Sequence, residues 1–242
     1  MAALDQTIID QLRQVSVATV TTALYKRGLR NQMIQAVYPV GRNRPASERI
    51  IGPAYTLRYM PAREDLNGLE VFRNHSHPQR KAVEECPPGY VLVMDSRKDA
   101  RAASAGSILV TRLQQRGVAG VVTDGGFRDS PEIGELDMPA YHHRPSSPTN
   151  LTLHQAIDIN VPIGCGDAPV FPGDVIFGDG EGVVVIPQHL AAEIAAEAVE
   201  MTAFEDFVTE KVKEGRSTLG LYPATDPKTL EDFAAWRKAN GR

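Results

Sequence analysis

Residues 117–129 read GVAGVVTDGGFRD. A short apolar run ends at Asp124-Gly125-Gly126, a pattern that predicts a buried strand followed by a turn. The segment just before it, residues 106–117, reads GSILVTRLQQRG and carries its isoleucine and leucines at helical intervals up to a terminal glycine. We expect Ser107 or Ser104 to be the N-cap of this helix. The two segments together predict a helix-to-strand unit that ends in a loop.

Similar patterns occur along the rest of the chain. Apolar residues at helical spacing predict further helices, and runs of β-branched residues predict strands, two of them joined by a glycine-rich hairpin at residues 178–182. A proline- and arginine-rich irregular segment is expected between residues 29 and 49. Strands with inserted helices favour a mixed, layered α/β domain. The expected helices are residues 5–28 (one or two helices), 189–214 and 228–239, and the expected strands are residues 50–59, 90–94, 161–165, 175–177 and 183–186.

Composition excludes several classes of protein. The chain has 242 residues and a formal net charge of −4, so it lacks the clustered excess of Lys and Arg typical of nucleic-acid binding. It has no apolar run long enough to cross a membrane, and its first residues do not form a signal peptide, so we expect a cytoplasmic protein. Cys86 and Cys165 lie far apart without metal-binding spacing, and we expect both to be buried free thiols.

Arg128 and Asp129 carry the clearest chemical signal. A guanidinium group can bind a substrate carboxylate through two hydrogen bonds, and a carboxylate oxygen is a ligand that Mg²⁺ or Mn²⁺ prefers. A 2-oxo acid offers a carboxylate and a carbonyl, so the pair is suited to orient such a substrate beside a metal. The glycines before the pair would allow the backbone to approach a ligand. The alternative is an ordinary surface ion pair that caps a helix beginning at Ser130-Pro131-Glu132.

The run at residues 117–129 resembles the signature of the family that contains the ribonuclease E activity regulator RraA and 4-hydroxy-4-methyl-2-oxoglutarate aldolase. Supporting matches cover most of residues 10–200. They are GPAYT at residues 52–56, PGYVLV at residues 88–93, Gly106 at the start of a helix, PGD at residues 172–174 and GDGEGVVVIP at residues 178–187.

The resemblance implies a layered β/β/α, swivelling-domain-like core with a mixed sheet and with N- and C-terminal helices. It places an RraA-like domain at residues 1–200 and a helical extension, packed at a subunit interface, at residues 201–242. Homotrimers or homohexamers are expected, with sites between subunits. A glutamate from a neighbour's C-terminal helix can join such a site, and the candidates are Glu200, Glu205 and Glu210, each of which can equally belong to a solvated helix face.

The resemblance also implies the residues of the site. Arg128 would bind the substrate carboxylate, Asp129 would bind a divalent metal (Mg²⁺ or Mn²⁺), and the amides of Gly106, Ser107 and Ile108 at a helix start would receive an anionic group. In the aldolases an acidic residue occupies the place of Ser107. A serine cannot act as a carboxylate base, so decarboxylation or dehydration is favoured over aldol cleavage.

Other polar residues are possible metal ligands. His75 and His77 could form a metal pair on an extended chain, but an exposed loop is the simpler interpretation. The neighbours His142 and His143 would point to opposite sides of a strand. Asp179 and Glu181 lie in a glycine-rich turn, where carboxylates are common for conformational reasons.

Two functional hypotheses follow. The first is a metal-dependent carbon-carbon lyase that acts on a small 2-oxo acid, as a pyruvate aldolase or an oxaloacetate decarboxylase, through a metal-stabilised enolate; a sugar-acid dehydratase would be a related enolate enzyme. The second is a non-catalytic regulator that binds a protein partner. A regulator needs neither Arg128 nor Asp129, and this chain keeps both.

Overall fold

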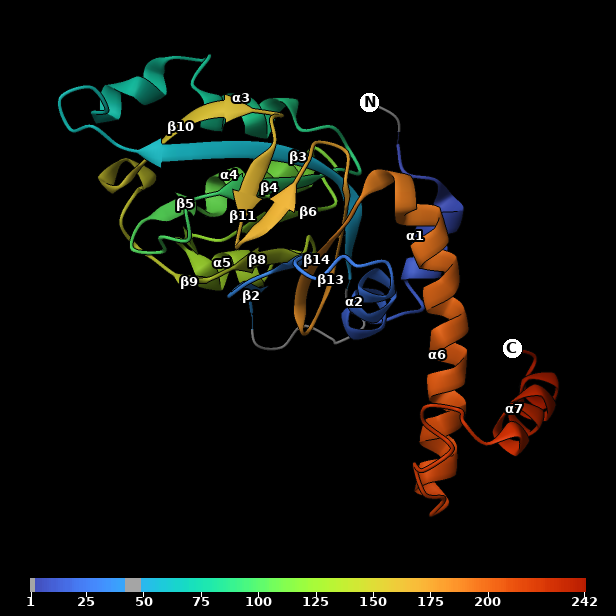
Figure 1. The fold of residues 1–242 in the computed structure, drawn as a ribbon. Helices are drawn as coiled ribbons and strands as arrows, with labels where there is room; N and C mark the ends of the chain where they lie inside the picture. Colours follow the sequence, from blue (N-terminus) through green and yellow to red (C-terminus); the bar gives the residue numbers. More distant parts are fainter. Residues whose placement is uncertain (1–2, 42–48) are drawn as a thin grey trace.

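A nine-stranded mixed sheet forms the centre of the computed structural model, which describes residues 3–41 and 49–242 (Figure 1). The strand order is β1-β14-β13-β3-β4-β6-β8-β2, and β10 pairs with β3 outside this path. The strands β3, β4, β6 and β8 run parallel, and the other pairings are antiparallel. The bounds are β1 (Met33–Ile34), β2 (Tyr38–Pro39), β3 (Ile50–Pro61), β4 (Val91–Asp95), β6 (Gly120–Thr123), β8 (Ala140–His142), β10 (His154–Ile159), β13 (Val175–Asp179) and β14 (Gly182–Ile186).

Two small sheets lie beside the central one. β5 (Ala103–Ala105), β7 (Gly126–Phe127) and β9 (Arg144–Pro145) form a parallel sheet, and β11 (Ile163–Cys165) pairs with β12 (Ala168–Val170) as a hairpin. Each strand of these small sheets has only two or three residues.

Helices cover one face of the central sheet and the β11–β12 hairpin covers the other. Val110 and Leu113 of one helix pack in a core with Leu92 and Val121 of the sheet. On the opposite face, the hairpin residues Ile163, Cys165, Ala168 and Val170 are packed with Ala54, Val91, Val93 and Val122. The layers are therefore β/β/α. The covering helices are α3 (Pro78–Glu85), α4 (Ser107–Gln115) and α5 (Ser130–Gly134), with the 3₁₀ turns η1 (Leu69–Arg73) and η2 (Asn150–Thr152) between elements.

The terminal helices pack on the part of the sheet formed by β13 and β14. Their shared core includes Leu12, Val20, Phe177 and Ile194. The helices are α1 (Gln6–Leu12), α2 (Val17–Lys26) and α6 (Ala191–Lys213), which follows the 3₁₀ turn η3 (Gln188–Leu190).

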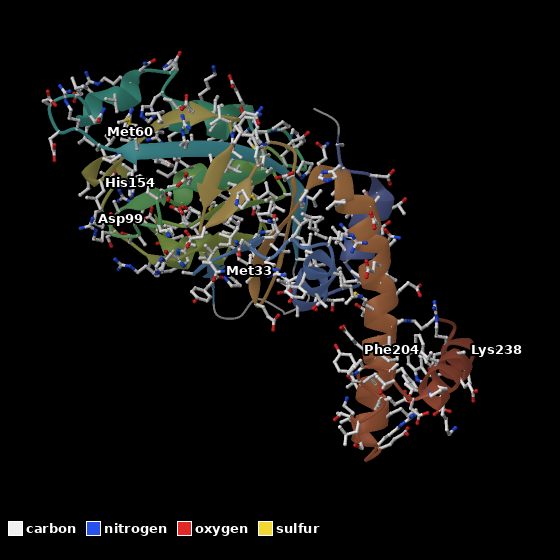
Figure 2. The ribbon with its side chains drawn as sticks, viewed as in Figure 1. Met33, Met60, Asp99, His154, Phe204 and Lys238 are labelled. Atoms are coloured by element: carbon white, nitrogen blue, oxygen red, sulfur yellow. The ribbon has the colours of Figure 1, made fainter. Side chains whose placement is uncertain are left out.

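The far half of α6 extends away from the sheet and carries α7 (Pro227–Asn240) (Figure 1). Aromatic side chains fill the space between these two helices, with Phe204 on α6 near the contact (Figure 2). Phe207 is fully buried there, and its ring centroid lies 5.5 Å from that of Phe233 and 6.0 Å from that of Trp236. Because α6 is continuous through residue 200, the division of the chain at that position stays a prediction.

Most expected elements are confirmed, and so is the mixed α/β fold with terminal helices. Residues 5–28 form two helices, the strands at residues 175–177 and 183–186 form the antiparallel pair β13–β14, and Cys86 and Cys165 are buried free thiols. Within the described ranges, no helix is both long and apolar enough to cross a bilayer.

Some expectations were wrong. The helix after Gly106 has Gly106 itself as its N-cap, and neither Ser104 nor Ser107 caps it. The segment expected to be irregular contains the strands β1 and β2, while its residues 42–48 lie outside the described residues. Helix α3 and strand β10 were not expected at all.

The contact between α6 and α7 generates a prediction. Phe207→Ala should remove the central ring of this contact at a cost of about 3–5 kcal/mol, typical of a buried Phe→Ala change. Amides of α7 should then exchange with solvent much faster, while those of β4 and β6 stay protected, as measured by hydrogen exchange. Val212→Ala on the same helix is the control, because Val212 is 41% exposed. Unchanged exchange of α7 in Phe207→Ala would contradict this account.

Candidate functional site

The loop after β6 places Arg128 and Asp129 at the carboxyl end of the parallel strands. β6 ends at Thr123, Asp124 and Gly125 form a turn, and β7 leads directly to Arg128. In open α/β sheets ligands bind outside the carboxyl ends of parallel strands, so the pair lies where a ligand is expected.

The two glycines of this loop serve internal packing. A Cβ atom on Gly125 would lie 2.6 Å from the Oγ of Ser104, and one on Gly126 would lie 2.5 Å from the Cβ of Ser146. Both glycines are buried. The expectation that they allow a ligand to approach was therefore wrong, because the space beside them is filled by the protein itself.

Asp124 fixes the start of the loop. Its Oδ1 accepts a hydrogen bond from the Ser96 amide (2.6 Å), and its Oδ2 accepts one each from the amides of Lys98 and Gly166 (3.0 Å each). These amides belong to the segment after β4 and to the β11–β12 hairpin. Burial raises the pKa of Asp124 to about 6 although the three amides oppose this shift. The Asp124 carboxylate thus links its own loop to the segment after β4 and to the β11–β12 hairpin.

A network of buried hydroxyl groups connects this point to β5. The Oγ of Ser104 lies 2.7 Å from the Oγ of Ser96 and 2.6 Å from the Oγ1 of Thr123, and all three side chains are buried. The Oγ1 of Thr123 also accepts a hydrogen bond from the Gly125 amide (2.9 Å). Hydrogen-bonded buried hydroxyls stiffen their surroundings, so the loop and β5 are held in a fixed relation.

Asp129 points to the start of α4. Its backbone adopts a left-handed conformation (φ 55°), and its side chain makes no cap to α5. Instead its Oδ2 accepts hydrogen bonds from the amide and the Oγ of Ser107, both at 3.3 Å, and lies 3.6 Å from the Nε of Arg128. The carboxylate therefore caps α4 from outside, a favourable place for a negative charge. The alternative is confirmed in part, because α5 begins at Ser130 with Asp129 as its N-cap residue, but the carboxylate makes its hydrogen bonds to α4 and none to α5.

Gly106 allows the side chains of Arg128 and Asp129 to lie close to the start of α4. A Cβ atom at position 106 would lie 2.7 Å from the Cγ of Arg128 and 2.9 Å from the Oδ2 of Asp129. Only a residue without a side chain leaves both groups where they are.

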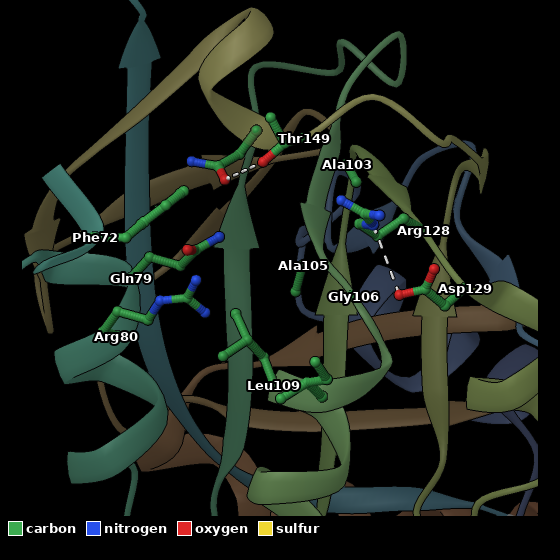
Figure 3. Close-up of a pocket in the computed structure, with 12 residues that line it drawn as sticks. Phe72, Gln79, Arg80, Ala103, Ala105, Gly106, Leu109, Arg128, Asp129 and Thr149 are labelled. Atoms are coloured by element: carbon green, nitrogen blue, oxygen red, sulfur yellow. Dashed lines mark hydrogen bonds and ion pairs between the residues drawn. The ribbon is translucent and has the colours of Figure 1, made fainter. Parts of the chain in front are cut away.

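A cavity of about 230 Å³ opens in front of this pair (Figure 3). The predicted residues Gly106, Ile108, Arg128 and Asp129 line it, whereas Ser107 reaches the site through its bonds to Asp129. Arg128 and Asp129 also border a second cavity of about 500 Å³ on the side of α5 and β9. Their side chains are 47% and 38% exposed, so both can receive a ligand.

Sequence reasoning missed the opposite wall of the smaller cavity. Gln79 and Arg80 of α3, Phe72 of η1 and the pair Thr149 and Asn150 also line it. The sequence does contain a signal for α3, because Pro78 follows His77 and proline is common at the first position of a helix.

The residues present fit a hydrated divalent cation. Asp129 is the sole carboxylate among the described residues that line the smaller cavity, and the described part of the chain contains no cluster of three or more His, Cys, Asp or Glu side chains suited to a metal. Mg²⁺ keeps several waters and commonly binds through one or two carboxylates together with substrate oxygens. The Oδ1 of Asp129 has no hydrogen-bond partner in the described structure and could serve as such a ligand.

The other candidate ligands are engaged elsewhere. His77 is buried beside the ring of Phe72, with centroids 5.2 Å apart, and burial lowers its pKa; the exposed loop expected there was wrong for this residue. His142 stacks on Phe127, and burial lowers its pKa to about 4. Asp179 accepts hydrogen bonds from the amides of Val17 and Glu181, which is the structural role expected.

The three candidate glutamates bond within their own chain. Glu200 pairs with Arg237 (2.6 Å), Glu205 accepts a hydrogen bond from Thr19 (2.8 Å) and Glu210 accepts one from the indole of Trp236 (2.8 Å). A contribution from any of them to a neighbouring subunit stays a prediction.

Residues 8–185 match the family model RraA-like, described as Aldolase/RraA. The chain belongs to this family. A relative from Halalkalibacterium halodurans, provisionally named a 4-hydroxy-4-methyl-2-oxoglutarate aldolase, is 29% identical over 88% of this chain and 92% of its own length. A protein of Burkholderia mallei with the same provisional name is 30% identical over 63% of this chain and 84% of its own.

Two solved structures share the fold. Streptomyces coelicolor RraAS2, described as an unusual member of the RNase ES inhibitor RraA protein family, superposes with a TM-score of 0.72 at 29% identity and covers 86% of this chain and 98% of its own. An uncharacterised protein of Pseudomonas syringae gives a TM-score of 0.75 at 22% identity over 92% of this chain and 100% of its own, which supports the fold alone.

The buried carboxylate of Asp124 predicts a pH dependence of stability. Its pKa is about 6 in the folded protein against a usual value of 3.8, so the folded state holds its proton more tightly than the unfolded chain does. The resulting stabilisation is complete below about pH 4 and is lost as the pH rises through 6. The wild type should therefore lose about 2–3 kcal/mol relative to Asp124→Asn between pH 4 and pH 7.

Urea unfolding of both proteins at a series of pH values measures this difference. Subtracting the two curves removes the titrations that the two proteins share. A difference that is flat across this range would show that Asp124 does not titrate as described.

Proposed function

We propose that this RraA-like protein is a divalent-metal-dependent carbon-carbon lyase that acts on a small 2-oxo acid. The observation that carries the proposal is the convergence of Arg128, Asp129 and the start of α4 on one cavity. Relatives provisionally named as 4-hydroxy-4-methyl-2-oxoglutarate aldolases support the reaction class.

Each group has a distinct task in this proposal. Arg128 binds the carboxylate next to the oxo group, because its planar guanidinium matches a carboxylate in two hydrogen bonds. The start of α4, at Gly106, Ser107 and Ile108, adds amide groups and the positive end of a helix dipole. Asp129 would hold Mg²⁺ or Mn²⁺, which when bound polarises the substrate carbonyl and stabilises the enolate produced as the carbon-carbon bond breaks.

Ser107 bears on which bond is broken. It donates a hydrogen bond to Asp129 and supplies no base. Aldol cleavage requires removal of a proton from the substrate hydroxyl, whereas decarboxylation starts from a carboxylate that is already ionised. Since no second carboxylate lines the described cavity, decarboxylation of an oxaloacetate-type acid needs the fewest additional groups.

A regulator that binds a protein partner is the second candidate. It is favoured by the similarity to Streptomyces coelicolor RraAS2, which is described within an RNase inhibitor family. Such a role does not depend on a metal at Asp129, so the two candidates make different predictions.

The proposal is tested by measuring pyruvate released from oxaloacetate and from 4-hydroxy-4-methyl-2-oxoglutarate with Mg²⁺, Mn²⁺ or a chelator. The wild type should exceed the rate with metal alone, and chelation should abolish the excess. Asp129→Ala and Arg128→Ala should each lower kcat/KM by about 100-fold or more, the usual loss when one group that stabilises developing charge is removed.

Asp137→Ala is the matched control, since Asp137 is an exposed carboxylate just beyond α5. It should retain full activity. Folded wild type that releases no pyruvate above the rate of metal alone would refute the lyase and favour the regulator, and activity that survives in Asp129→Ala would refute the assigned site.

A further inference from the structure

Arg80 is a second arginine that faces the smaller cavity. It projects from α3 on the wall opposite Arg128, so two guanidinium groups border one space of about 230 Å³ (Figure 3). The first of these has a partner carboxylate in Asp129. Arg80 forms no ion pair with any carboxylate of the described residues.

The surroundings of Arg80 are poor in negative charge. Its guanidinium lies 4.5 Å from the ring centroid of Phe72. Burial raises the pKa of the nearby Tyr59 phenol, which is therefore neutral. Burial lowers the pKa of Arg80 itself. A half-buried arginine without a counter-charge is costly to maintain, and an anionic ligand would offset that cost.

Helix α3 is held firmly against the site. Gln79 is 2% exposed, and its Nε2 donates hydrogen bonds to the carbonyl of Ser104 (2.6 Å) and to the hydroxyl of Tyr59 (3.2 Å). Ser104 lies two residues before Gly106 on the strand that forms the floor of the cavity. The position of Arg80 is therefore coupled to that of Arg128 through rigid neighbours.

We infer that Arg80 is a specificity-determining residue that binds a second carboxylate, so that the site selects 2-oxo acids with an anionic tail over those with a neutral one. This inference rests on the proposed function, in which Arg128 binds the first carboxylate. A dianion placed between the two arginines gives each guanidinium a counter-charge, which is how charge complementarity produces selectivity.

Binding of two matched ligands tests the inference. 2-Oxoglutarate and 2-oxopentanoate have the same chain length and differ in the terminal carboxylate, and neither carries the leaving group of a lyase substrate. Unreactive ligands are preferred because their affinities can be measured without turnover. In calorimetry with Mn²⁺, the wild type should bind 2-oxoglutarate about 10- to 100-fold more tightly, as expected for one charge-assisted hydrogen-bonded pair.

Arg80→Gln should abolish this preference and leave the affinity for 2-oxopentanoate unchanged, and Arg80→Lys should restore part of it. Arg73→Gln is the control for net charge, because Arg73 is an exposed arginine of η1 that does not line the cavity. Equal affinity of the wild type for both ligands, or a preference that persists in Arg80→Gln, would overturn the role of Arg80 while leaving the proposed function standing. Binding of neither ligand would overturn both.

Discussion

The carboxylate of Asp124 is the constraint on which the site depends. It is 1% exposed, yet it accepts hydrogen bonds from three backbone amides, two in the segment after β4 and one in the β11–β12 hairpin. A buried carboxylate is tolerated only when its oxygens are satisfied in this way. The loop that carries Arg128 and Asp129 therefore begins from a fixed point at the end of β6.

The layered sheet provides the frame for that point. The parallel strands β3, β4 and β6 bring their carboxyl ends to the same edge, and the helices α3 and α4 cover the adjoining face. Arg80 of α3 and Arg128 of the loop after β7 line the same cavity. The proposed ligand site thus lies between a helix layer and a loop, both of which are held by buried hydrogen bonds.

The sequence was sufficient to predict the elements with strong periodicity. Residues 117–129 predict β6 and the loop because a buried strand next to glycines leaves a clear pattern. The family resemblance points to Arg128, Asp129 and Gly106, which line one cavity in the structure while their roles stay a prediction. The capping of α4 by Asp129 was not predictable, because it depends on a contact between residues 22 positions apart in the chain.

Other features were missed because tertiary contacts determine them. The strands β5, β7 and β9 have two or three residues each, too few to show an alternating pattern. Helix α3 has few apolar residues and follows a histidine-rich segment, so the sequence shows no helical periodicity there. As a consequence Arg80 was not considered, although it borders the same cavity as Arg128.

The central claim is that Asp129, with a divalent metal, allows this site to form the enolate of a bound 2-oxo acid. Exchange of the methyl protons of pyruvate for deuterium, followed by NMR in D₂O with Mg²⁺ or Mn²⁺, measures enolate formation without reference to the carbon-carbon bond broken. The account predicts exchange faster than with metal alone in the wild type and its loss in Asp129→Ala. Exchange at the rate of metal alone, from wild-type protein that is folded, would contradict the account.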